Sequence, residues 1–126
     1  MVLWSLEQSL GGELFVPKIP SYRITDVAEA IGPGCEKPIT GIRPGEKIHE
    51  EMITASDSFT TIDLGAYYAI LPSDGRVQQC YKEAGINSTA VPSGFAYNSG
   101  SNPEFLSVDQ LRALIREHVD PAFQPL

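Results

Sequence analysis

Residues 41–50 read Gly-Ile-Arg-Pro-Gly-Glu-Lys-Ile-His-Glu, and this stretch decides the predicted fold. We expect a β-strand over 39–43 that ends at Arg43 and a helix over 44–53 that follows at once. Pro44 suits the first helical position, because its φ angle is already fixed and its missing N–H would be unpaired there anyway. The Arg43 guanidinium would then lie beside the unpaired N–H groups of a helix start, where anions bind.

The same turn predicts a binding site made of Arg43, Pro44, Gly45 and Glu46. Glu46 follows Arg43 by about one helical turn, and its carboxylate can accept hydrogen bonds from sugar hydroxyls. An arginine for phosphate and a carboxylate for ribose are what a nucleotide-sugar site needs. The simpler alternative is a helix that starts with proline and keeps its charges in solvent.

Outward from this stretch, the chain reads as a small α/β fold. A strand over 13–17, a helix over 25–31 and the strand over 39–43 would form a right-handed βαβ unit with parallel strands. A further strand over 67–71 would extend this short parallel sheet, and the helices would pack against it.

Two more helices are marked by their own residues. Residues 2–10 place leucines on one face, and the glycine pair that follows stops the helix. The best-marked helix covers 108–118, where Ser107 is the expected N-cap and Gln110 completes a capping box. Residues 54–62 read as a loop. Residues 73–104 also read as loop-rich, with a short helix around 77–84.

Length and charge limit the classes of protein that this chain can be. Its 126 residues indicate one domain over 1–126. A net charge of −7 with only nine Lys and Arg argues against nucleic acid and against anionic membranes as partners. The sequence shows no membrane-spanning run and no signal-peptide pattern, so a cytoplasmic location is expected.

Cysteine and histidine usage does not predict a metal site. Cys35 and Cys80 stand alone in the sequence. A disulfide between them is geometrically possible, but free thiols are expected in a reducing compartment. His49 and His118 have no second ligand at a suitable spacing. No metal is therefore expected.

Five segments, in this order along the chain, resemble one family. They are residues 12–20, 41–50, 67–71, 97–100 and 104–112. Together they resemble the C-terminal part of extended short-chain dehydrogenase/reductases of bacterial polysaccharide biosynthesis. Within that group the chain is most similar to inverting UDP-N-acetylglucosamine 4,6-dehydratases, which start pseudaminic acid synthesis. The resemblance covers nearly the whole chain and is weakest over about 73–92.

Two motifs of that family are absent from this sequence. The glycine spacing Gly-x-x-Gly-x-x-Gly, which holds the dinucleotide, does not occur, and no tyrosine is followed four residues later by lysine. The resemblance therefore implies a small C-terminal substrate-binding domain without a Rossmann domain, which binds a UDP-sugar weakly at Arg43, Pro44, Gly45 and Glu46. It also implies no bound cofactor and no catalysis by this chain alone.

The alternative is a non-catalytic binding or structural module that self-associates and keeps a relic UDP-sugar site. A homodimer, or a partner that carries the dinucleotide-binding domain, is expected in either case. The expected contact face is the apolar side of the first helix, which is formed by Val2, Leu3, Trp4, Leu6 and Leu10. Such a face rarely stays exposed on a soluble monomer. The alternative is that the first helix folds back on its own domain and leaves a monomer.

Overall fold

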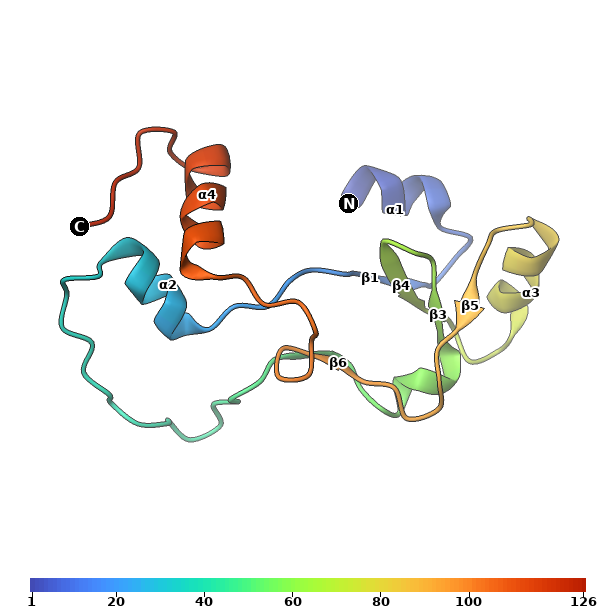
Figure 1. Ribbon diagram of the computed structural model, residues 1–126. Coiled ribbons are helices and arrows are strands. Elements are labelled where there is room, and N and C mark those ends of the chain that lie inside the picture. Colours follow the sequence, from blue (N-terminus) through green and yellow to red (C-terminus); the bar gives the residue numbers. More distant parts are fainter. The chain divides into compact units, whose positions relative to one another are not determined.

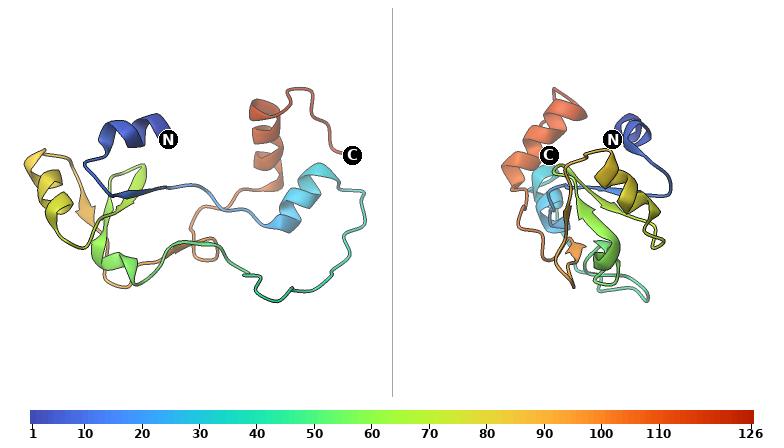
Figure 2. Two further views of the ribbon diagram at one scale, coloured as in Figure 1. Left: turned by 180° about the vertical axis from the view of Figure 1, so that it is seen from behind. Right: turned by 90° about the vertical axis from the view of Figure 1, so that its right-hand side faces the viewer.

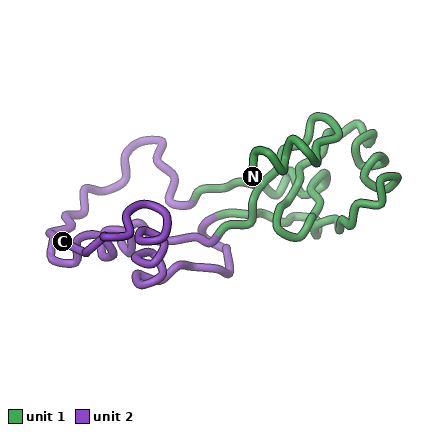
Figure 3. Tube along the Cα trace, turned by 90° about the horizontal axis from the view of Figure 1, so that it is seen from above, with its two compact units in different colours: residues 1–19, 50–98 green, residues 20–49, 99–126 purple.

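The computed structural model describes residues 1–126, and the chain forms two compact units. Unit 1 contains residues 1–19 and 50–98, and unit 2 contains residues 20–49 and 99–126 (Figure 3). Each unit is therefore assembled from two separate segments of the sequence. The single domain expected from the chain length stays a prediction.

Unit 1 is built on a four-stranded antiparallel sheet with the order β1-β4-β3-β5 (Figure 1). The strands are β1 (Leu14–Pro17), β3 (Thr61–Asp63), β4 (Tyr67–Ile70) and β5 (Thr89–Ala90). β1 and β4 confirm the strands expected over 13–17 and 67–71. In this pair Phe15 lies opposite Ala69, and Val16 lies opposite Tyr68.

The predicted parallel βαβ unit is wrong. β1 pairs antiparallel with β4, a strand about fifty residues further along the chain, and residues 39–43 form no strand. The prediction paired the apolar runs at 13–17 and 39–43 as parallel strands because a helix lies between them in sequence. Side chains in the second run are exposed, however, and Ile39 is 97% exposed, so this run has no buried face to pair against a sheet.

The remaining elements of unit 1 come from segments that read mostly as loops. β2 (Glu51–Ile53) pairs antiparallel with β6 (Tyr97–Asn98), and a short 3-10 helix, η1 (Asp57–Thr60), leads directly into β3. The prediction that 54–62 is a loop is therefore wrong for η1 and for the start of β3. α3 (Arg76–Glu83) confirms the short helix expected around 77–84.

The core of unit 1 is formed by side chains of the sheet and of α3. The ribbon views in Figure 2 show this helix beside the sheet. Val77 and Tyr81 of α3 pack on Ile62, Ala69 and Leu71. Tyr81 is only 1% exposed, and its hydroxyl oxygen has no hydrogen-bond partner. Burial, with the negative charge of Glu13 adding to it, raises the pKa of Tyr81 to about 12.

α1 (Val2–Gln8) contacts the strands of unit 1 through the aromatic side chain of Trp4. The Trp4 ring stacks on Tyr67 with 4.1 Å between centroids and meets the edge of Phe15 at 5.2 Å. Trp4 therefore does not belong to the exposed apolar face on which it was expected. On α1 that face is left to Val2, Leu3 and Leu6, which are 68%, 77% and 72% exposed. Leu10, the fifth residue expected on it, is 47% exposed but lies beyond the end of α1 at Gln8.

Unit 2 contains two helices, α2 (Ile24–Ile31) and α4 (Val108–His118). The bounds of α4 are those predicted, and its capping box is confirmed: the Ser107 side chain accepts a hydrogen bond from the Gln110 backbone N–H, and the Gln110 side chain accepts one from the Ser107 backbone N–H. Arg112 of α4 donates to the carbonyl oxygens of Glu29 and Ala30 in α2, each at 3.1 Å. No helix in the chain is both long enough and apolar enough to cross a membrane.

The helix predicted over 44–53 is wrong. Residues 41–50 are exposed and contain no helix, and 51–53 form β2. The apolar side chains that could have packed such a helix against the protein are largely exposed, Ile48 at 76% and Met52 at 42%. An isolated helix of this length is unstable without tertiary packing, so nothing here favours one.

Candidate functional site

The predicted site at residues 43–46 is a β-turn. The Glu46 backbone N–H donates to the Arg43 carbonyl oxygen at 3.0 Å, and Gly45 has a φ angle of +82°. Proline at the second position and a glycine with positive φ at the third define a type II turn. Pro44 is compatible with this turn for the same reason that it suited a helix start, namely its fixed φ angle.

The turn brings the two charged members of the site together. The Glu46 carboxylate accepts one hydrogen bond from the Arg43 backbone N–H at 2.9 Å and another from the Arg43 Nη2 at 3.2 Å. These bonds, the backbone one first, lower the pKa of Glu46, so its carboxylate is ionised at neutral pH. The structure thus places Arg43, Pro44, Gly45 and Glu46 in one short turn.

This pair is open to solvent. The Arg43 side chain is 85% exposed and the Glu46 side chain is 42% exposed. One guanidinium nitrogen contacts Glu46, and the remaining donors of Arg43 face no protein acceptor. A planar guanidinium with unused donors can bind a phosphate or carboxylate group through two hydrogen bonds. The anion would meet the side chain of Arg43, since the helix start once expected to help bind it does not exist.

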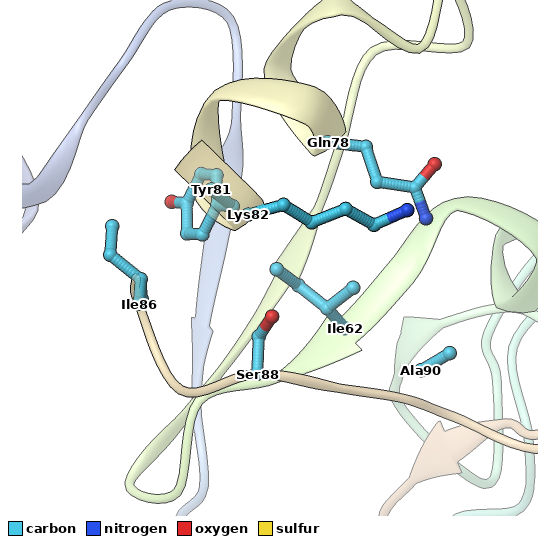
Figure 4. A pocket seen from close by; sticks show the side chains of 7 residues that line it. All are labelled: Ile62, Gln78, Tyr81, Lys82, Ile86, Ser88 and Ala90. Carbon is cyan, nitrogen blue, oxygen red and sulfur yellow. The ribbon is translucent and has the colours of Figure 1, made fainter. Parts of the chain in front are cut away.

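A second feature, which the sequence analysis missed, is an open pocket of about 370 Å³ in unit 1 (Figure 4). It lies between α3 and the strands β3 and β5. Gln78 and Lys82 are four residues apart on α3 and therefore share one helix face. That spacing could have been read from the sequence. The opposite wall could not, because β3 was assigned to a loop.

Other chemistry-bearing side chains have structural roles in unit 1 or are simply exposed. Lys18 forms an ion pair with Asp63 at 2.7 Å and lies 4.4 Å from the centre of the Tyr68 ring. The Tyr97 hydroxyl both accepts from the Ile19 N–H and donates to the Ile19 carbonyl. Cys35 and Cys80 are free and exposed, and no group of three or more potential ligands is placed to hold a metal ion.

Comparison with known proteins assigns the chain to a family. Residues 1–72 match the family described as "Polysaccharide biosynthesis protein". The chain is also 42% identical over 118 residues to a UDP-N-acetylglucosamine 4,6-dehydratase (inverting) of Campylobacter jejuni, a match that covers 90% of this chain and 35% of that protein. It is 31% identical to a UDP-glucose 4-epimerase of Rickettsia felis, over 91% of this chain and 34% of the epimerase.

A solved structure shares the fold. The X-ray structure of Pen from Bacillus thuringiensis matches 91% of this chain and 34% of its own chain with a TM-score of 0.71 at 25% sequence identity. The chain therefore belongs to the polysaccharide biosynthesis protein family, and its similarity to inverting UDP-N-acetylglucosamine 4,6-dehydratases is confirmed. It spans about a third of the length of the curated relatives that it matches.

Proposed function

We propose that this chain provides the nucleotide-sugar-binding C-terminal part of a UDP-N-acetylglucosamine 4,6-dehydratase-like protein of the cytoplasm, and that it does not catalyse dehydration alone. The observation that carries the proposal is the 42% identity to an inverting dehydratase over 90% of the chain. The match covers 35% of that relative, which is consistent with a role of this chain as one part of a larger site.

In the proposed site, Arg43 binds a phosphate of the UDP-sugar and Glu46 accepts hydrogen bonds from the ribose hydroxyls. The type II turn at Pro44 and Gly45 keeps these two side chains within one short stretch of backbone. The exposed guanidinium and the ionised Glu46 carboxylate support this assignment. Affinity for free UDP is expected to be weak, because an exposed turn surrounds little of a ligand.

The residues of the chain support the proposed lack of catalysis. The sequence contains no tyrosine followed four residues later by lysine and no glycine-rich dinucleotide spacing. A dehydration that passes through a hydride carrier needs a protein that holds the carrier in place. We therefore propose that activity requires a partner with a dinucleotide-binding domain.

Binding is tested by titrating UDP and UDP-N-acetylglucosamine onto the 15N-labelled chain and following its backbone amide signals. We expect the largest shifts at residues 43–46 and a loss of about 1.5–3 kcal/mol of binding free energy in Arg43→Ala. Arg76→Ala is a matched control, because Arg76 is 86% exposed and pairs with a nearby carboxylate, that of Asp74. Equal affinities of the folded wild-type chain and Arg43→Ala would reject the site.

Activity is tested by incubating the purified chain with NAD(P)⁺ and UDP-N-acetylglucosamine and analysing the products by mass spectrometry. No 4-keto-6-deoxy sugar nucleotide is expected. Formation of that product above the level of a mock preparation would overturn the proposal that the chain is not catalytic alone. This result would leave the binding assignment to be judged by the titration.

The exposed side of α1 favours one alternative, a module that self-associates as a homodimer. Val2, Leu3 and Leu6 lie together on a helix that has no buried residue. Two copies related by twofold symmetry could cover this face. Sedimentation equilibrium at tens of micromolar, roughly the range of modest interfaces, should give a dimer for the wild type and a monomer for Leu6→Glu. A wild-type monomer would reject the alternative.

A further inference from the structure

The pocket beside α3 has an apolar floor and a polar rim. Ile62, Tyr81 and Ile86 form the floor, and the first two are at most 5% exposed. Gln78, Lys82 and Ser88 form the rim. Figure 4 shows the Lys82 side chain extending across the pocket beside Ile62, with the Ser88 hydroxyl on the opposite wall.

The three rim side chains have no partner within the protein. The ion pairs of unit 1 join Lys18 to Asp63 and Arg76 to Asp74, so Lys82 remains a cation without a counter-ion. The nearest acidic side chain in sequence, Glu83, accepts a hydrogen bond from Gln79. Lys82 thus lacks a carboxylate partner although acidic residues outnumber basic ones in this chain, whose net charge is −7.

The local fold explains why this space stays open. Val77 and Tyr81 fix α3 to the sheet, and Gln78 and Lys82 each follow one of them in sequence, so they project beside that contact. β5, which forms the other side, has only two residues, so the sheet ends before it can fill the gap. The pocket is thus a consequence of how α3 and the short edge strand meet.

We propose that this pocket binds a small organic anion, whose carboxylate or phosphate group contacts Lys82, Gln78 and Ser88 and whose flat apolar body lies on Ile62 and Ile86. The volume of about 370 Å³ lies in the range of small-molecule sites. An ammonium, an amide and a hydroxyl supply the donors that either anionic group needs. This site is separate from the turn at Arg43 and does not rest on the proposed function.

The test is an amide-shift titration of the whole 15N-labelled chain with phenyl phosphate and with benzoate. These two probes share a ring and differ in the anionic group, so the tighter one identifies which group the rim prefers. Saturable shifts at residues 76–90 are expected for at least one of them below about 10 mM, the range of weak specific binding. Benzyl alcohol and inorganic phosphate, each lacking one half of the chemistry, should bind more weakly.

Two variants test separately how the charge of the pocket and its open volume contribute to binding. Lys82→Gln should weaken binding about threefold to tenfold, since an exposed cation is partly screened by water. The matched control Lys47→Gln removes an exposed lysine of unit 2 and should leave binding unchanged. Ala90→Phe keeps the charge but fills the rim from the exposed strand β5, and should abolish binding while the chain keeps a folded amide spectrum.

Three results would overturn the proposal. The first is the absence of saturable shifts at 76–90 with both aromatic anions. The second is binding of benzyl alcohol or inorganic phosphate as tight as that of phenyl phosphate and benzoate. The third is binding that Lys82→Gln and Ala90→Phe, both folded, leave unchanged.

Discussion

The two units of this chain are held together in different ways. All but two of the buried apolar side chains belong to unit 1, and the exceptions are Ala30 and Leu111 in unit 2. Unit 2 has a smaller apolar core, and its two helices are also joined by polar contacts from Arg112 to the carbonyls of Glu29 and Ala30. Because apolar burial is the dominant favourable term in folding, unit 1 should be the more stable part of the chain.

A pair of matched core truncations tests most directly whether unit 1 is more stable than unit 2. Leu71→Ala in unit 1 and Leu111→Ala in unit 2 remove side chains of similar burial, 5% and 8% exposed. Leu71 lies in a cluster of five buried residues, so its truncation should cost about 2–5 kcal/mol of unfolding free energy. Leu111 has fewer buried neighbours, and its loss should cost less.

Urea unfolding gives the two free energies, and hydrogen exchange assigns each loss to a unit. Leu71→Ala should reduce protection in β3 and β4, while Leu111→Ala should reduce it in α2 and α4. An equal or larger cost for Leu111→Ala would contradict the contrast between the units.

A smaller effect tests the polar part of unit 2. Ser107→Ala removes the side chain that accepts the Gln110 N–H at the start of α4, and should cost about 1 kcal/mol. Hydrogen exchange should show the loss in the first turn of α4 and leave β1 and β4 protected. Ser93→Ala, an exposed serine in a loop of unit 1, is the control and should change little. Equal effects of the two variants would show that the capping box contributes nothing measurable.

The smallest expected effect is a loss of folding stability at acidic pH. In unit 1 burial tends to raise the pKa of Glu13 and of Asp63, but hydrogen bonds outweigh it and leave both pKa values lowered. For Glu13 the donors are the N–H groups of Leu10 and Gly11 and the Ser9 hydroxyl. For Asp63 the main donor is Lys18. A carboxyl group with a lowered folded-state pKa stabilises the fold above its ordinary pKa, and this stabilisation is lost as the pH falls through the folded-state value.

Stability of unit 1 should therefore fall as the pH drops below about 5, by less than about 1 kcal/mol for each group. Glu13→Gln and Asp63→Asn should each flatten this dependence in urea unfolding followed over pH. Glu7→Gln, on the exposed side of α1, is the control. A pH profile that neither Glu13→Gln nor Asp63→Asn alters would contradict the role given to these carboxylates.

An element could be predicted from the sequence when the contacts that determine it join residues close together in the chain. The bounds of α4 were predicted correctly because its start is marked by Ser107 and Gln110, which lie next to and within that helix. The partner of β1 could not be predicted in the same way, since β4 lies far along the chain and no local pattern specifies their register. The family was recognisable because several separate motifs occur in the correct order.

The sequence predicted which residues form the candidate site, but not the backbone conformation that they adopt. Pro-Gly is compatible both with a helix start and with a type II turn, and local sequence does not distinguish them. The absence of burial at Ile42 and Ile48, 66% and 76% exposed, removes the packing that would have favoured the helix. The pocket beside α3 was missed because one of its walls depends on the pairing of β3 with β5.

The interleaving of the two units has a consequence for dissecting the chain. Because residues 20–49 interrupt unit 1 and residues 50–98 interrupt unit 2, no single cut separates one unit from the other. A protease that cleaves within the exposed stretch 41–50 would leave each half-chain with pieces of both units. The two halves should then behave as a split protein, unfolded when apart and regaining structure by complementation when mixed.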